Sequence, residues 1–266
     1  MMQTATTDAA EMAPSTPGQV AEVATAELEA SIELLSDLDD RDRAAPTDCA
    51  GWTVHDLTAH LVGQYQGLAK PSVHLRHHHR AHVRYPALSR LDADHRQQID
   101  DLGGRTGPEL VVMLAAVGPK AIRARRRVPG LVRRQRIGWM YPGEPLPDDR
   151  LSYVLDVLGL RDAWMHRIDI ARATGRPLAL GSRDGVIVAQ VITDPDRAWD
   201  GPPTLLELTG PAGGRWTVGL GTPTATIRAD TVDYLRALSG RNDNPALQAD
   251  GDSAAAAAAA AARIAF

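Results

Sequence analysis

The segment Leu160-Arg-Asp-Ala-Trp-Met-His-Arg-Ile-Asp169 places a carboxylate, Asp162, four residues before an imidazole, His166. On a helix this spacing brings the two side chains to one face, one turn apart. The Trp, Met and Ile residues that surround the imidazole in this segment indicate that the helix is partly buried here. The segment therefore predicts a polar pair directed into the interior of a helical domain.

A second imidazole, His60, closes the segment Gly51-Trp-Thr-Val-His-Asp-Leu-Thr-Ala-His60, which also has a helical pattern. It follows Leu57 by three residues, so we expect it on the inward face of its helix. Zinc favours imidazole and carboxylate ligands, and three protein ligands leave an open position for water or a thiol. His60, Asp162 and His166 are therefore a candidate catalytic metal site on facing helices. The residues alone leave open a core histidine satisfied by an Asp partner, or an Asp162 paired with a neighbouring arginine.

Two further carboxylates lie close to these histidines in the sequence. Asp56 stands three residues after Thr53, which predicts a shortened capping box at the start of a helix rather than a ligand. Asp169 stands three residues after His166 and could orient its imidazole from behind. A surface ion pair between Asp169 and Arg172 is the alternative.

The stretch Val73-His-Leu-Arg-His-His-His-Arg-Ala-His82 is a competing candidate for metal binding. If it is helical, His74, His78 and His82 share one face. The interleaved arginines oppose the concentration of a cation there and favour a solvated basic face. A cofactor's acidic groups could also dock on this face, so its role stays open.

Composition and charge exclude several classes of function. The chain has 266 residues and a net charge of -4, and its arginine-rich runs lack interleaved aromatic residues, so we expect no nucleic acid partner. We expect no membrane partner either, because no apolar run has membrane-spanning length. The first 16 residues lack the basic start and apolar core of a signal peptide. The single Cys49 fits a reducing cytoplasm, and the preference for Arg over Lys suggests a GC-rich, actinobacterial type of source.

Helical periodicity predicts four helices in the first two thirds of the chain. They cover residues 19–38, a segment from residue 53 that Pro71 ends or kinks, residues 108–127 and residues 148–174. Residues 129–147 are rich in Gly and Pro and predict a long irregular connection. Helices joined by such unequal connections indicate a bundle with a crossover.

The pattern changes after Pro177. Residues 204–209, 215–220 and 224–229 predict strands, followed by a helix to residues 239–240, a further strand at 246–249 and a poly-Ala helix from residue 252 or 253. The β-branched run at 186–191 fits either a helix or a strand. The predicted fold class is α+β. Its parts are a disordered tail (1–17), a helical bundle with the metal site (18–177) and a small α+β domain (178–266).

The segment Cys49-Ala-Gly-Trp-Thr-Val-His-Asp-Leu-Thr-Ala-His60 resembles a signature of the mycothiol-dependent maleylpyruvate isomerase family, part of the DinB-like superfamily of metal-binding four-helix bundles. Met165-His-Arg-Ile-Asp169, with Gly175-Arg-Pro177 after it, resembles the family's second signature. Tyr234-Leu-Arg-Ala-Leu-Ser-Gly-Arg241 and Ala249-Asp-Gly-Asp252 resemble its sterol-carrier-like C-terminal domain. The resemblance covers the chain from about residue 18.

The resemblance implies that His60, Asp162 and His166 hold Zn²⁺ or another divalent metal, and that the partners are mycothiol or a similar thiol and an electrophilic small molecule. The reaction would be S-transfer or cis–trans isomerisation. Arg241 is the residue we nominate to bind a substrate or cofactor carboxylate. Two residues depart from the family pattern, because Ala50 replaces Pro and Asp162 replaces the usual Glu. A non-catalytic binding module with a vestigial metal site, and a metal-dependent hydrolase, are the alternatives.

Overall fold

The computed structural model describes residues 5–144, 146–242 and 245–264, and combines helices with a five-stranded sheet. The predicted α+β fold class is therefore confirmed. The described chain divides into two compact units. One extends from Thr16 to Leu178 and is helical, and the other contains the described residues up to Ser15 and from Ala179 onward.

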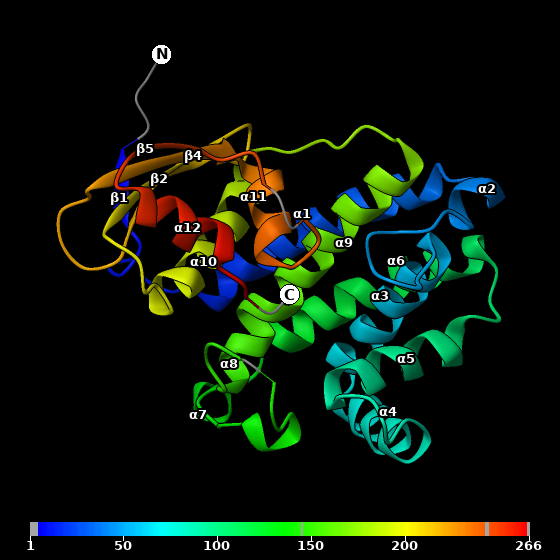
Figure 1. Ribbon diagram of the computed structural model, residues 1–266. Coiled ribbons are helices and arrows are strands. Elements are labelled where there is room, and N and C mark those ends of the chain that lie inside the picture. Colours follow the sequence, from blue (N-terminus) through cyan, green and yellow to red (C-terminus); the bar gives the residue numbers. More distant parts are fainter. Residues whose placement is uncertain (1–4, 145, 243–244, 265–266) are drawn as a thin grey trace. The chain divides into compact units, whose positions relative to one another are not determined.

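Four long helices of the first unit form a bundle (Figure 1). They are α1 (Pro17–Ser36), α3 (Val54–Ala69), α6 (Gly107–Arg126) and α9 (Gly159–Thr174). Helices α1 and α3 each contact both α6 and α9, which closes a ring of four. Leu35, Leu57, Leu114 and Trp164 are fully buried between them. Each such side chain contributes about 1.5–3 kcal/mol by leaving water, so this core supports the bundle.

The helix ends of the bundle follow local sequence signals. Thr53 and Asp56 form a capping box at the start of α3, as predicted, and Thr106 caps α6 in the same way with Glu109. Gly175 ends α9 with a left-handed φ of 66°, a conformation that glycine adopts without steric cost. These caps fix where the helices that carry the candidate ligands begin and end.

Two further helices pack against α3, and the sequence did not resolve them. They are α4 (Pro71–Arg84) and α5 (Arg90–Leu102). Pro71 does not kink α3, since it occupies the first turn of α4, where its missing N–H costs no hydrogen bond. Both helices are strongly polar in sequence, which hid their apolar periodicity. The small helices of the unit are α2 (Asp40–Arg43), α7 (Gly130–Arg133), the 3₁₀ turn η1 (Gly138–Met140) and α8 (Leu151–Tyr153).

A π-helical turn, η2 (Val154–Leu158), joins α8 to α9. The sequence predicted one regular helix over residues 148–174, so the structure corrects both its start and its regularity. A π turn adds a residue to the helical repeat and is frequent at functional sites. Here it stands one turn before Asp162 and sets the face on which that side chain lies.

The second unit is a mixed sheet with the strand order β1-β3-β2-β4-β5. The strands are β1 (Thr6–Asp8), β2 (Thr204–Thr209), β3 (Gly214–Val218), β4 (Ala225–Asp230) and β5 (Gln248–Gly251). β2 pairs antiparallel with β3 and parallel with β4, so Leu206 lies beside both Trp216 and Ile227. All three side chains are buried, which gives the sheet one apolar face.

Three helices belong to this sheet (Figure 1): α10 (Ser182–Arg197), α11 (Thr231–Leu238) and α12 (Ser253–Ala261). The run at residues 186–191, left open by the sequence, is part of α10, where Ile187, Val188, Val191 and Ile192 form a buried stripe of helical period. Tertiary burial of this stripe outweighs the strand preference of β-branched residues.

The expectation of a disordered tail over residues 1–17 is wrong for part of that range. Thr6–Asp8 form β1, which pairs in parallel with β3, and Ala9 beyond it is buried. The edge of β3 offers unpaired backbone groups, and a distant segment of the chain satisfies them. Pro17 already belongs to α1. Residues 1–4 lie outside the described residues.

Among the described residues, no helix combines the length and the apolar character needed to cross a membrane.

Candidate metal centre

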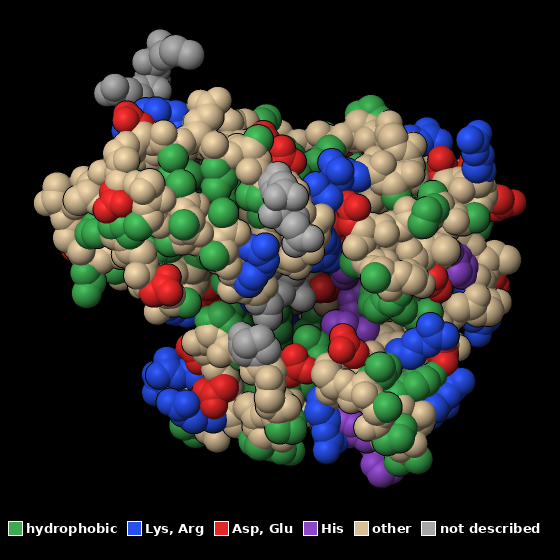
Figure 2. All heavy atoms as spheres, viewed as in Figure 1, with side chains coloured by type: hydrophobic (Ala, Val, Ile, Leu, Met, Phe, Trp, Pro, Cys, Tyr) green, Lys and Arg blue, Asp and Glu red, His purple; other side chains and the backbone are tan. Residues whose placement is uncertain are grey.

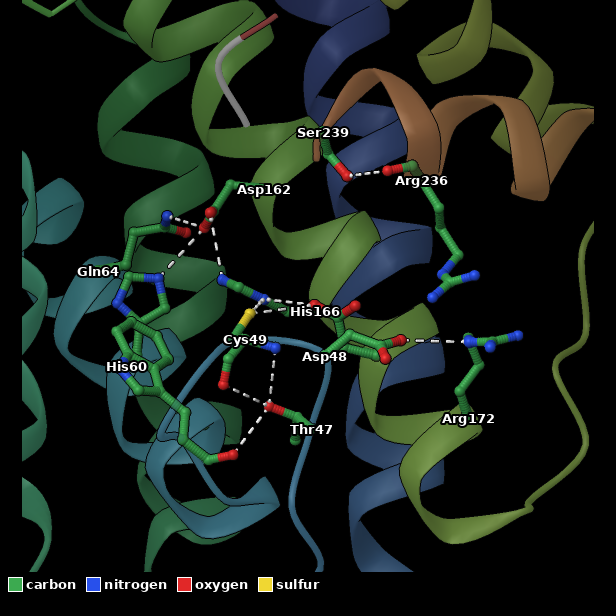
Figure 3. Close-up of polar contacts among 12 residues, drawn as sticks. Thr47, Asp48, Cys49, His60, Gln64, Asp162, His166, Arg172, Arg236 and Ser239 are labelled. Atoms are coloured by element: carbon green, nitrogen blue, oxygen red, sulfur yellow. Dashed lines mark hydrogen bonds and ion pairs between the residues drawn. The ribbon is translucent and has the colours of Figure 1, made fainter. Parts of the chain in front are cut away.

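His60 on α3 and Asp162 and His166 on α9 point toward one another in the interior of the bundle (Figure 3). The Nε2 atom of His60 lies 3.3 Å from Oδ2 of Asp162, and the Nε2 atom of His166 lies 3.2 Å from Oδ1. One ligating atom from each residue falls within 4.8 Å of the other two. Two ligands of one tetrahedral zinc ion are separated by about 3.4 Å, so these contacts match the spacing of a shared ion.

The opposite nitrogen of each imidazole is held by a hydrogen bond. Nδ1 of His60 lies 2.7 Å from Oε1 of Gln98, and Nδ1 of His166 lies 3.1 Å from Oδ2 of Asp169. Donation from Nδ1 leaves the lone pair of a neutral ring on Nε2, directed at Asp162. Carboxylate and amide partners of this kind are typical behind metal-bound histidines. Two lone pairs and a carboxylate that face one another could hold a cation between them, and imidazole and carboxylate are ligands that zinc accepts.

In the absence of a metal, a proton fills part of this role. Burial disfavours the charged imidazolium, yet the Asp162 carboxylate and the hydrogen bonds of Asp162, Asp169 and Cys49 raise the pKa of His166 well above its usual range. Burial would likewise raise the pKa of Asp162, but His166 and His60 hold it well below its usual range. The metal-free site is therefore a buried ion pair, and a metal must displace its proton to bind.

Aromatic rings surround the candidate ligands. The indole of Trp52 lies 5.4 Å from the ring of His60 and 6.3 Å from that of His166, measured between centroids. His95 on α5 packs edge-on against His60 at 4.6 Å. Burial, and next the proximity of His60, lower the pKa of His95 to about 3, so this ring is neutral at pH 7.

The sequence reasoning missed His95, Gln98 and Gln64. Gln64 donates from Nε2 to Oδ2 of Asp162 over 2.6 Å, and its position one turn after His60 on α3 is the signal that could have identified it. His95 and Gln98 come from α5, 35 and 38 residues after His60, and no local pattern connects them to it. Only the packing of α5 on α3 brings them to the site.

A profile of the domain family described as "Mycothiol maleylpyruvate isomerase N-terminal domain" matches residues 24–171, which is more than half of the chain. The chain belongs to the mycothiol maleylpyruvate isomerase family. The match contains α3 and nearly all of α9, and with them His60, Asp162 and His166. The resemblance predicted from the sequence motifs is confirmed.

Two solved structures share the fold of this family member. They are the mycothiol-dependent maleylpyruvate isomerase and a histidine-to-alanine mutant of it. They are 15% and 14% identical in sequence, each with a TM-score of 0.56, and each alignment covers 92% of this chain and 97% of the solved one. No match was found among the curated proteins.

A second cluster in this maleylpyruvate isomerase relative, Cys49 with His166 and Asp169, could also be considered for a metal. The Cys49 thiol donates to Oδ2 of Asp169 over 3.5 Å. Its sulfur lies 3.9 Å from Nδ1 of His166 (Figure 3). Here the Cys49 thiol and Nδ1 of His166 are donors, and the Asp169 carboxylate accepts from both. At Asp162, by contrast, the lone pairs on Nε2 of His60 and His166 face a carboxylate, which is also an acceptor. The cluster therefore supports His166 from behind, and Cys49 has a place that the sequence did not assign.

The open alternatives for the carboxylates are decided by contacts. Asp169 is fully buried behind His166, while Arg172 pairs with Asp48 over 3.2 Å at the surface. Arg241, nominated for a carboxylate, belongs to the other unit, where its backbone N–H donates to the carbonyl of Arg236. Its nomination stays a prediction.

Asp162 has a shorter side chain than the Glu usual in this family, and its carboxylate still contacts both His60 and His166. The π turn and the close packing of α3 and α9 place both oxygens of Asp162 within 3.3 Å of an imidazole nitrogen, without the extra methylene of Glu. We expect Asp162→Glu to weaken zinc affinity about tenfold, because an added methylene overpacks a buried site by about 1–3 kcal/mol. Competition with a zinc chelator measures this affinity. A variant that binds zinc more tightly would show that Asp162 is too short.

Asp169 is expected to control zinc affinity without touching the metal. In Asp169→Asn the side chain keeps its size but loses the charge that orients Nδ1 of His166, so we expect zinc affinity to fall about 10–100-fold. The same chelator competition applies, with exposed Asp37→Asn as the matched control. If Asp169→Asn bound zinc as tightly as wild type, Asp169 would have no role in orienting His166 for the metal.

Proposed function

We propose that this chain is a zinc-dependent enzyme that uses mycothiol, or a similar low-molecular-weight thiol, for S-transfer to, or cis–trans isomerisation of, an electrophilic small molecule. The convergence of His60, Asp162 and His166 in the bundle is the observation that carries this proposal. Membership of the mycothiol maleylpyruvate isomerase family supports the thiol and the isomerase reaction.

The three residues would hold the metal and leave a position open for the thiol. A metal at this site would lower the pKa of a bound thiol, so that the nucleophilic thiolate is present at neutral pH. The chain's own contribution is to orient the ligands through Gln98 and Asp169 and to keep the site largely free of water, since His60 and Asp169 are fully buried.

The substrate class follows from the same proposal. The solved relative is named for maleylpyruvate, an unsaturated acid, and we extend to this chain an electrophilic substrate that carries a carboxylate. Arg241 is our proposed partner for that carboxylate, because a guanidinium binds carboxylates in a two-pronged geometry. A thiol-dependent reaction and a single cysteine are consistent with a reducing cytoplasm as its location.

Metal analysis and a thiol assay test the proposal together. We expect dialysed protein to retain about one zinc per chain. We also expect it to convert maleylpyruvate to its trans isomer, or to a thioether, only when mycothiol is added. Native protein that is free of metal and rebinds none would overturn the zinc assignment. Zinc retained without any thiol-dependent product would instead favour a hydrolase in which water fills the open position.

A further inference from the structure

A second group of histidines lies outside the candidate metal centre, on α4. Figure 2 shows histidine side chains at the surface in this part of the molecule. His74, His78 and His82 share one face of the helix. The rings of His74 and His78 stack with centroids 6.0 Å apart, and the ring of His82 meets that of His78 edge-on at 4.4 Å. The proposed thiol chemistry does not use them.

The spacing of one pair in this row suits a metal ion. The Nε2 atoms of His78 and His82 lie 3.2 Å apart. Two imidazoles bound to one zinc ion place their nitrogens about 3.3 Å apart. The two residues are four apart in the sequence, so their rings project from the same face of α4. Both could therefore bind one ion without movement of the backbone.

The other nitrogen of His78 is held in the manner of a metal-bound histidine. Its Nδ1 lies 2.8 Å from Oδ2 of Asp94, a carboxylate on α5 that is 4% exposed. Donation from Nδ1 leaves the lone pair of His78 on Nε2, the atom that faces His82. The second oxygen of Asp94, Oδ1, is buried and has no hydrogen-bond partner among the described residues. The hydroxyl of Tyr141 lies 3.4 Å from Oδ2 and closes the other side of the carboxylate.

Two of the arginines beside this pair of histidines are themselves paired with acids. Arg80 and Arg84, which flank His82 along α4, pair with Asp101 and Asp100 of α5, at 3.5 Å and 3.0 Å. Each of these two arginines is therefore paired with an acid that the sequence pattern did not connect to this stretch.

We propose that His78 and His82 form a second metal site, which binds a divalent transition metal such as Zn²⁺ or Ni²⁺, with Asp94 as the carboxylate that orients His78. Two protein ligands leave the remaining positions to water, so this site is weaker and more exchangeable than a three-ligand centre. The proposal is independent of the function proposed for the bundle site, because the two sites share no residue.

Zinc titration of full-length protein whose bundle site is already loaded tests the proposal. We expect wild type to bind one additional zinc equivalent, and we expect His78→Ala and His82→Ala each to weaken this binding at least about tenfold. Asp94→Asn, which keeps the side-chain volume, should weaken it about 10–100-fold. His79→Ala is the matched control, because His79 is exposed on the same helix and lies outside the row. It should bind like wild type.

The alternative is a hydrogen-bond chain in which His82 donates to His78 and His78 donates to Asp94, with no metal. In that case wild type binds no additional equivalent, and the proposal is overturned. An equal loss in His79→Ala would also overturn it, because the zinc would then be held by the histidine-rich helix without a defined site. His82→Gln retains polarity and bulk but lacks the imidazole ligand. If circular dichroism shows that this variant is folded, weaker zinc binding by it reflects the loss of the ligand and not of the fold.

Discussion

His60→Ala is expected to remove zinc from the bundle site and to lower thiol-dependent turnover by more than about 100-fold. Changes behind a metal ligand already cost about 10–100-fold in affinity or activity, and His60 is proposed as a ligand itself. The substitution leaves Asp162 and His166, which belong to one helix and already pair with each other over 3.2 Å. A metal would then have ligands from α9 alone, and the link across the bundle to α3 would be lost.

Two measurements check this prediction: zinc content after dialysis and the rate of product formation with mycothiol. His55→Ala is the matched control, because His55 lies on the same helix but contacts the carbonyl of Gly103 rather than the site. We expect the control to keep its zinc and its rate. A His60→Ala protein with unchanged zinc would show that the ion is bound elsewhere and would contradict the proposed ligand set.

Glu27→Ala is expected to destabilise the bundle by about 3–5 kcal/mol, the usual cost of leaving one member of a buried ion pair uncompensated. Nε of Arg167 donates to both carboxylate oxygens of Glu27, over 2.9 Å and 3.0 Å, and both residues are 4% exposed. The pair joins α1 to α9 next to His166. Its loss should therefore also loosen the helix that carries two of the proposed ligands.

Urea and thermal unfolding, followed by circular dichroism, measure the effect. Glu29→Ala provides the control, since Glu29 is exposed on the same helix and such surface changes usually stay within about 0.5 kcal/mol. Equal stability of the two variants would mean that Arg167 finds another partner or reaches water. Zinc added to Glu27→Ala should recover part of the lost stability, because binding to the folded state alone shifts the equilibrium toward it.

The local signals in the sequence proved reliable where a few neighbouring residues decide the outcome. Thr53 with Asp56 predicted the start of a helix, because a cap needs only residues three apart. The strand pattern of residues 204–209 was confirmed because the side chains alternate between a buried and a solvated face. Polar helices and distant pairings were not found, as α5 and the edge strand β1 show.

The spacing of Asp162 and His166 determined by itself that a carboxylate and an imidazole share one face of a helix, and the motifs indicated the family. The tertiary structure decided what that pair faces. Packing of α3 brings His60 to it, and packing of α5 adds Gln98 and His95. The physical reason is that helical periodicity fixes contacts within one turn, whereas the partners of a buried charge are chosen by the side chains that packing brings within a few ångströms.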